Sequence, residues 1–184
     1  MSARRGGLGR YLSYVLRHDP ADLGLHLQPG GWVLVADLLA ALNRKPGSAA
    51  TIEDLREVVR TDSKGRFSLS EDESRMRANQ GHSAEVDLML TPVAPPEHLY
   101  HGTSEDLFWV ITSEGLRKME RHHVHLSGDL ATARQVARRR VRPVVFKVRA
   151  AAHAASGAQY FQSENGVWLV DTVPADYLVL EERI

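Results

Sequence analysis

Cysteine is absent from this 184-residue chain. Its absence excludes disulfide bonds, a thiol nucleophile and cysteine-ligated zinc. Long apolar runs are also missing, and none approaches the roughly 20 residues that a membrane-spanning helix needs. The first residues carry no apolar stretch of the kind found in signal peptides. We therefore expect a cytoplasmic protein with no membrane contact.

A surplus of charge of one sign is missing as well. The 23 Lys and Arg residues balance 23 Asp and Glu residues, beside nine His. An overall field that attracts polyanions is therefore excluded, and any contact with nucleic acid must come from a local cluster. No GxGxxG or GxxxxGK[ST] motif occurs, so neither a Rossmann site nor a P-loop is predicted. The neutral balance makes a monomer with no obligate protein partner the default expectation.

Residues 75–83, with the sequence Arg-Met-Arg-Ala-Asn-Gln-Gly-His-Ser, form such a local cluster. The guanidinium groups of Arg75 and Arg77 offer planar forks of donors that suit phosphate oxygens. Gly81 lets the backbone approach a ligand closely, and the neighbouring amides add donors without adding charge. The segment therefore predicts an anion-binding site. The alternative is a solvated strand end followed by a turn.

Apolar residues at helical spacing predict a first helix over residues 8–16. Pro20 disfavours helical geometry at the residue before it, so Arg17 and His18 are expected in the last helical turn. Their positive charges there either complement the helix dipole or serve a ligand.

Two further helices are predicted in the first half. Gly30 and Gly31 form a turn, and residues 32–35 lead into an amphipathic helix through residue 42. A loop is predicted at residues 45–48. A third helix begins at Thr51, which with Asp54 resembles a capping box.

A β-hairpin is expected to follow the third helix. Residues 67–70 alternate between apolar and polar, a turn is predicted at residues 71–73, and Met76 lies on the returning strand. Arg77 is expected where that strand leaves the hairpin. Three helices followed by a hairpin are the order of a winged-helix module. The mixed charge of the third helix argues against binding to duplex DNA.

Three prolines within residues 90–96 predict a domain boundary, which gives domains at 1–90 and 91–184. The second domain reads as α/β. Residues 98–103 predict a short strand and a tight turn, with Thr103 beginning a helix N-cap. Backbone and hydroxyl donors at such a turn suit a pyrophosphate or a ribose, although ordinary structured turns look alike.

Histidines and arginines are concentrated in two later segments. His123 and His125 share one face of a predicted strand, but no third ligand is placed and HExxH spacing is absent, so no metal is expected. The next helix ends in an arginine run at residues 138–140. The run is either a solvated helix end or part of a functional site.

Read together, several motifs resemble the RNA 2′-phosphotransferase family (KptA type, the tRNA 2′-phosphotransferases). The resemblance covers nearly the whole chain, with the motifs in the order of the family. They are Leu-Ser-Tyr-Val-Leu-Arg-His-Asp-Pro at 12–20, Arg-Ala-Asn-Gln-Gly-His-Ser at 77–83, Leu-Tyr-His-Gly-Thr at 99–103, His-Leu-Ser at 125–127 and the stretch 165–178.

The resemblance implies an α+β protein with an N-terminal winged-helix-like lobe and a C-terminal NAD-binding lobe of the ADP-ribosyltransferase type. It implies that NAD is consumed as co-substrate and that the partner is RNA bearing a 2′-phosphate, as at tRNA splice junctions. The RNA phosphate attacks the nicotinamide ribose and expels nicotinamide. The ribose 2″-hydroxyl then attacks that phosphate, which gives 2′-hydroxyl RNA and ADP-ribose 1″,2″-cyclic phosphate.

Site residues follow from the resemblance, position by position. The catalytic Arg-His-Arg-Arg set falls on Arg17, His18, Arg77 and Arg139. Arg138 remains a rival of Arg139, because Val141 stands where the family usually has glycine. The cofactor is expected at His101, Gly102, Thr103, His125, Ser127 and Val167, the last at a position where many ADP-ribosyltransferases carry a catalytic Glu. Gln80, His82, Ser83 and Arg138 are further candidates for contacting the substrate phosphate.

Three alternatives remain open at the level of sequence. The same first step could ADP-ribosylate terminal phosphates of RNA or DNA and stop there. The chain could instead be a non-catalytic RNA-binding protein whose second lobe senses NAD. A histidine-ligated metalloenzyme is the third possibility.

Overall fold

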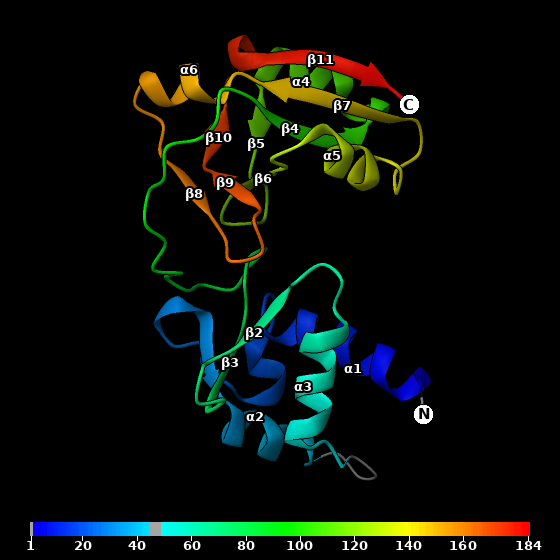
Figure 1. Ribbon diagram of the computed structural model, residues 1–184, viewed down its shortest axis with the longest axis vertical. Helices are drawn as coiled ribbons and strands as arrows, with labels where there is room; N and C mark the ends of the chain where they lie inside the picture. Colours follow the sequence, from blue (N-terminus) through cyan, green and yellow to red (C-terminus); the bar gives the residue numbers. More distant parts are fainter. Residues whose placement is uncertain (1, 45–48) are drawn as a thin grey trace. The chain divides into compact units, whose positions relative to one another are not determined.

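The computed structural model describes residues 2–44 and 49–184, so the loop predicted at 45–48 lies outside the described residues. The chain divides into two compact units, residues 1–89 and 90–184 (Figure 1). Each unit combines helices with small antiparallel sheets. The predicted α+β class is confirmed.

Helices and a three-stranded sheet build the first unit. The antiparallel sheet has the order β1-β3-β2, so β3 is its central strand. Residues of all its α-helices and strands contribute to one core, with Leu12, Leu38 and Leu55 fully buried. The elements are α1 (Ser2–Val15), η1 (Pro20–Leu23), η2 (Pro29–Gly31), β1 (Trp32–Leu34), α2 (Val35–Leu42), α3 (Ile52–Thr61), β2 (Phe67–Leu69) and β3 (Arg75–Ala78).

The start of α2 differs from the prediction. Residues 32–34 form a strand of their own, β1, directly before the helix, and β1 pairs with β3 in the register Trp32 to Arg77. Arg77 therefore lies inside the central strand rather than at its exit from the hairpin. The hairpin itself, from β2 to β3, is confirmed.

Three sheets and three α-helices form the second unit. The sheets have the orders β11-β7-β4, β6-β9-β8 and β10-β5, and all pairs are antiparallel. The elements are β4 (Leu99–Ser104), η3 (Glu105–Leu107), α4 (Phe108–Glu114), β5 (Leu116–Arg117), β6 (Val124–Leu126), α5 (Leu130–Ala137), β7 (Pro143–Val148), α6 (Ala150–Ala155), β8 (Tyr160–Gln162), β9 (Trp168–Val170), β10 (Thr172–Val173), η4 (Ala175–Tyr177) and β11 (Leu178–Arg183).

Helices α4 and α5 cover opposite faces of the β11-β7-β4 sheet (Figure 1). On one face, the ring of Phe108 stacks on Phe146, with 5.8 Å between centroids. On the other face, α5 lies so close to β4 that a Cβ on Gly102 would come within 2.3 Å of the Ala133 carbonyl oxygen. Only glycine fits there, because a side-chain carbon would collide with helix backbone.

Strand β4 runs further than predicted. Residues 101–103 do not turn but continue the strand, opposite Val144, Val145 and Phe146 of β7. The helix cap falls one residue later, at Ser104, whose hydroxyl accepts the Asp106 N–H. The backbone groups of residues 101–103 thus belong to a sheet and not to a turn, so the predicted turn with backbone donors for a pyrophosphate or a ribose is wrong.

No helix in the described residues is long and apolar enough to cross a membrane.

Candidate active site

The end of α1 and the segment after β3 are joined by backbone hydrogen bonds. The N–H groups of Ser83 and Ala84 both donate to the Arg17 carbonyl, at 2.9 Å each. Nδ1 of His18 lies 2.8 Å from the Ser83 hydroxyl oxygen. The structure therefore brings Arg17, His18 and Ser83 together, although more than 60 residues separate them in sequence. Arg17 and His18 lie in a hydrogen-bonded turn just after α1, not in its last helical turn.

Arg77 is fixed by aromatic and backbone contacts. Its guanidinium lies 4.4 Å from the centre of the Trp32 ring, within the range of a cation–π interaction. One terminal nitrogen donates to the Gly30 carbonyl at 3.3 Å. Arg77 is half-buried, so part of its charge is shielded while part remains accessible to an anion.

The Gly30–Gly31 turn links Arg77 to His82. His82 is almost fully buried, and a Cβ on Gly31 would lie 3.3 Å from its Nε2. Gln80 is half-buried in the same segment. The residues predicted for the first unit thus lie in the turn after α1, on β3 and in the segment that follows β3.

His101 and His125 form the centre of the predicted site in the second unit. Nδ1 of His101 lies 3.0 Å from the His125 carbonyl, which can only accept, so Nδ1 carries the proton. Burial lowers the pKa of His101 most strongly, the hydrogen bond opposes this, and the charges of Arg121 and Arg140 lower it further. The ring is therefore neutral near pH 7, and its Nε2 keeps a lone pair that can accept from a hydroxyl.

Arg121 contacts a predicted site residue and was not itself predicted from the sequence. One of its terminal nitrogens lies 2.9 Å from Nδ1 of His125. A guanidinium only donates, so Nδ1 accepts and the His125 proton sits on Nε2. The sequence does contain a signal, because Arg121 directly precedes the segment of three histidines that ends at His125. From its local pattern, that segment was interpreted only as a possible metal site.

The arginine run follows α5, as predicted, and it is exposed. Arg138 caps the helix, and Arg138, Arg139 and Arg140 all face solvent. The run follows Ala137, whose Cβ approaches Gly102. Of the three arginines, Arg140 acts on the pKa of His101. The assignment of a catalytic role to Arg139 remains a prediction.

The remaining candidates are set in sheet structure. Ser127 and Tyr100 exchange backbone hydrogen bonds of 2.8 and 3.0 Å, which ties β4 to β6. Thr103 is buried. Val167 precedes β9, and its carbonyl accepts from the Ser163 N–H and hydroxyl at 3.0 and 3.1 Å.

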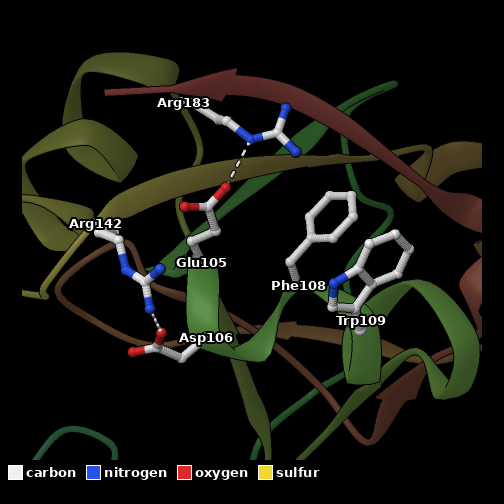
Figure 2. A pocket seen from close by; sticks show the side chains of 6 residues that line it. All are labelled: Glu105, Asp106, Phe108, Trp109, Arg142 and Arg183. Carbon is white, nitrogen blue, oxygen red and sulfur yellow. Dashed lines mark hydrogen bonds and ion pairs between the residues drawn. The ribbon is translucent and has the colours of Figure 1, made fainter.

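A separate cavity of about 380 Å³ opens beside η3 and the N-terminus of α4 (Figure 2). Ion pairs Arg142–Asp106 and Arg183–Glu105 line it, so its charges cancel. Arg183 also lies 5.1 Å above the Phe108 ring. None of the predicted site residues is among its lining residues, which are Glu105, Asp106, Phe108, Trp109, Arg142 and Arg183.

Metal ligands do not gather in the described part of the chain. Across residues 2–44 and 49–184, no group of three His, Cys, Asp or Glu side chains could hold a metal ion. His123 lies just before β6 and packs edge-on against Phe161, with 5.6 Å between ring centroids.

Comparison with known proteins defines the class of protein. The model of the family described as RNA 2′-phosphotransferase, Tpt1/KptA family, matches residues 3–172. A probable RNA 2′-phosphotransferase from Trichormus variabilis is 51% identical over 178 residues, 96% of this chain and 96% of the relative. One from Nostoc punctiforme is 50% identical over 173 residues, covering 93% and 94%. One from Rhizobium leguminosarum bv. trifolii is 48% identical over 172 residues, covering 93% and 91%.

The match extends across both units and includes every predicted site residue. The chain belongs to the RNA 2′-phosphotransferase (Tpt1/KptA) family.

Proposed function

We propose that this chain removes an internal RNA 2′-phosphate, as at tRNA splice junctions, in a reaction that consumes NAD. The reaction passes through an ADP-ribosylated RNA 2′-phosphate and releases 2′-hydroxyl RNA, nicotinamide and ADP-ribose 1″,2″-cyclic phosphate. Family membership supports the removal of the phosphate. The observation that carries the proposal is that hydrogen bonds hold Arg17, His18 and Ser83 together, so that their cationic and hydroxyl groups form one cluster.

Residues of the first unit would hold the RNA 2′-phosphate. A dianion calls for charge-assisted donors in fixed positions, and Arg77 is fixed by Trp32 and Gly30. The imidazole of His18 is exposed and oriented by Ser83, so it can donate to a phosphate oxygen. No enzyme nucleophile is needed, because the substrate phosphate itself attacks. The residues therefore act by orientation and by stabilising developing charge.

Residues of the second unit would hold NAD, which supplies an activated ribose carbon with nicotinamide as its leaving group. His101 fits this task, because its neutral ring presents Nε2 as an acceptor for a ribose hydroxyl. Thr103 lies on the same strand, β4, and Ser127 pairs with Tyr100 of that strand. Val167 offers no carboxylate, which suits an acceptor that is already an anion and needs no general base.

Arg121 competes with Arg139 and Arg138 for the fourth place in the Arg-His-Arg-Arg set. Its contact with His125 and its effect on the pKa of His101 favour Arg121. We expect Arg121→Ala to lower the rate of phosphate removal about 100-fold or more, the usual cost of losing a donor that stabilises developing charge. Arg139→Ala and Arg138→Ala should each change it only a few-fold. A loss confined to Arg139→Ala would restore the assignment made from the sequence.

The deciding experiment uses a short RNA with one internal 2′-phosphate, with and without NAD. NAD-dependent loss of the phosphate, together with ADP-ribose 1″,2″-cyclic phosphate, supports the proposal. An ADP-ribosylated RNA that persists would point to modification of phosphates without their removal. Loss of the phosphate that is independent of NAD, or no turnover, would contradict it. Retained activity in excess EDTA would remove the metalloenzyme alternative.

A further inference from the structure

Two arginines share one indole in the first unit. The guanidinium of Arg77 lies 4.4 Å from the Trp32 ring centre, and that of Arg75 lies 5.3 Å from it. The sheet register explains the arrangement, since Trp32 lies directly opposite Arg77 and diagonal to Arg75. Large side chains at diagonal positions of an antiparallel pair can reach one another.

The turn before β1 leaves room for this arrangement. Gly30 has a φ of +80°, and a Cβ there would lie 3.0 Å from Cδ1 of Trp32 and 3.7 Å from a terminal nitrogen of Arg77. The glycine therefore lets the indole lie flat along the turn while its carbonyl accepts from Arg77. The indole packs against the turn, the Arg77 guanidinium is hydrogen-bonded to it, and the Arg75 guanidinium is placed by the indole.

The proposed binding of the 2′-phosphate assigns a role to Arg77 but none to Arg75. Arg77 is half-buried, whereas Arg75 is exposed on the same face of the sheet. Residues two apart on a strand are separated by about 6.8 Å. That spacing is of the order of the distance between neighbouring phosphates in an RNA strand. Two cations held side by side repel each other, and two anions at the same spacing relieve that repulsion.

We propose that Arg75 binds the phosphodiester adjacent to the 2′-phosphorylated nucleotide, and that Trp32 is the positioning residue that holds Arg75 and Arg77 at the required spacing. The proposal rests on the proposed function and adds to it a second anion position. It makes the substrate an RNA strand rather than an isolated nucleotide 2′-phosphate.

The test compares two substrates with Arg75→Ala. One is a short RNA with one internal 2′-phosphate, and the other is the same RNA with neutral methylphosphonates at the flanking linkages. We expect Arg75→Ala to lower kcat/KM for the first about tenfold through KM, with kcat and the KM for NAD unchanged. The neutral substrate should react equally well with both proteins. Losing one phosphate contact should also reduce the salt slope of RNA binding by about 0.7.

Arg60→Ala is the matched control, because Arg60 is an exposed arginine of the same unit that pairs with Glu57. This variant should leave kcat/KM for both substrates unchanged. Trp32→Phe keeps a ring beneath the cations and should retain most of the preference for the charged substrate. Trp32→Leu should lose that preference, with kcat reduced as Arg77 loosens.

Several outcomes would overturn the proposal. Equal losses on the charged and the neutral substrates would make Arg75 a structural residue, and no loss would remove it from the site. A raised KM for NAD would assign the contact to the pyrophosphate of NAD. If the wild-type protein shows no NAD-dependent turnover, the proposed function fails. Binding of the two RNAs, followed by fluorescence anisotropy, would then still decide whether Arg75 reads the flanking phosphodiester.

Discussion

At the scale of single residues, two positions lead to predictions about stability, and the first is His153. His153 is buried, with Nδ1 3.0 Å from the Tyr160 hydroxyl and its ring 4.7 Å from that of Tyr177. Burial lowers the pKa of His153 and raises the pKa of Tyr160 to about 12. Both groups are therefore neutral over the physiological range, and the hydrogen bond between them is one between uncharged partners.

We expect acid to destabilise the protein through His153. Its folded pKa lies below the unfolded value of about 6.5, so the unfolded chain takes up the proton first as pH falls. Stability is then unaffected above that value and decreases below it. His153→Gln keeps a polar partner but does not titrate, so its melting temperature should fall less between pH 7 and pH 5 than that of the wild type. Parallel curves would contradict this account, and His26→Gln, at an exposed histidine, is the control.

Gly102 tests the contact of β4 with α5. Gly102→Ala places a carbon 2.3 Å from the Ala133 carbonyl, which requires the helix to move. Overpacking of this kind costs about 1–3 kcal/mol, and urea unfolding would measure it. In Gly128→Ala the new carbon would meet Trp168 at an ordinary 3.5 Å, so its stability should stay close to that of the wild type. Equal stabilities of the two variants would show that α5 can move away from β4 at little cost in free energy.

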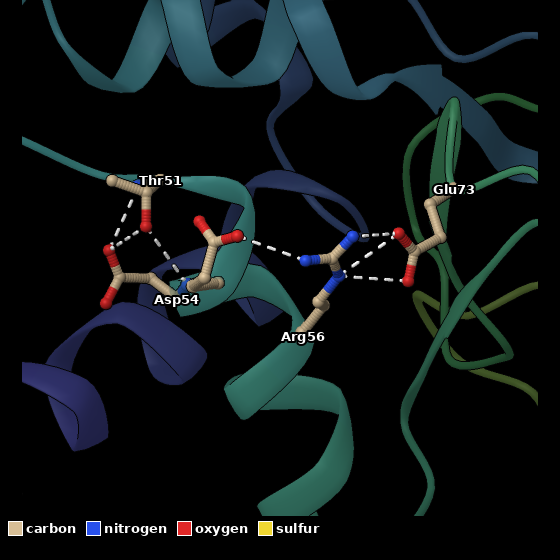
Figure 3. A network of polar contacts seen from close by, with 5 residues as sticks. Thr51, Asp54, Arg56 and Glu73 are labelled. Atoms are coloured by element: carbon tan, nitrogen blue, oxygen red, sulfur yellow. Dashed lines mark hydrogen bonds and ion pairs between the residues drawn. The ribbon is translucent and has the colours of Figure 1, made fainter.

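At the scale of elements, α3 shows how far local sequence determines structure. The predicted capping box is confirmed: Thr51 Oγ accepts the Asp54 N–H at 3.3 Å, and Asp54 accepts the Thr51 N–H at 3.0 Å (Figure 3). Arg56 then pairs with Glu73 in the hairpin turn, which connects the helix to β2 and β3 (Figure 3). The cap is local and the ion pair is not, so only the cap could be predicted.

Thr51→Ala should lower the free energy of unfolding by about 0.5–2 kcal/mol, the cost of losing an N-cap. Chemical denaturation followed by circular dichroism would measure it. Thr51→Ser, which keeps the capping hydroxyl, should be nearly neutral. A loss as large in Thr51→Ser as in Thr51→Ala would assign the effect to the methyl group and not to the cap.

The strands show where sequence reasoning ends. Trp32–Leu34 is only three residues long and leads straight into a helix, so its pairing with β3 is visible only in the fold. Gly102 and Thr103 resemble turn residues but lie in a strand. The glycine is needed because α5 packs directly against β4 and leaves no room for a Cβ. Arg121 lies four residues before His125, and its contact with that ring depends on how the two side chains are oriented, which the sequence alone does not give. Long-range packing decides the first two cases, and the orientation of two neighbouring side chains decides the third.

At the scale of the whole molecule, each unit contains a core of its own. We expect a protease site inserted between residues 89 and 90 to yield two fragments that both keep their secondary structure after cleavage. Circular dichroism of the separated fragments would measure this. Collapse of either fragment to a random coil would show that its core needs the other unit.

The hydrogen bonds from Ser83 and Ala84 to the Arg17 carbonyl involve the main chain alone. Substitution of either side chain therefore leaves this fastening in place, whereas a change in chain length does not. Deleting one residue between Ala78 and Ser83 would shift the chain by one position, so that other N–H groups would face the Arg17 carbonyl. The Ser83 hydroxyl would then no longer lie beside His18. In this stretch the number of residues is therefore constrained as well as their identity, so homologous chains should hardly ever show an insertion or a deletion here.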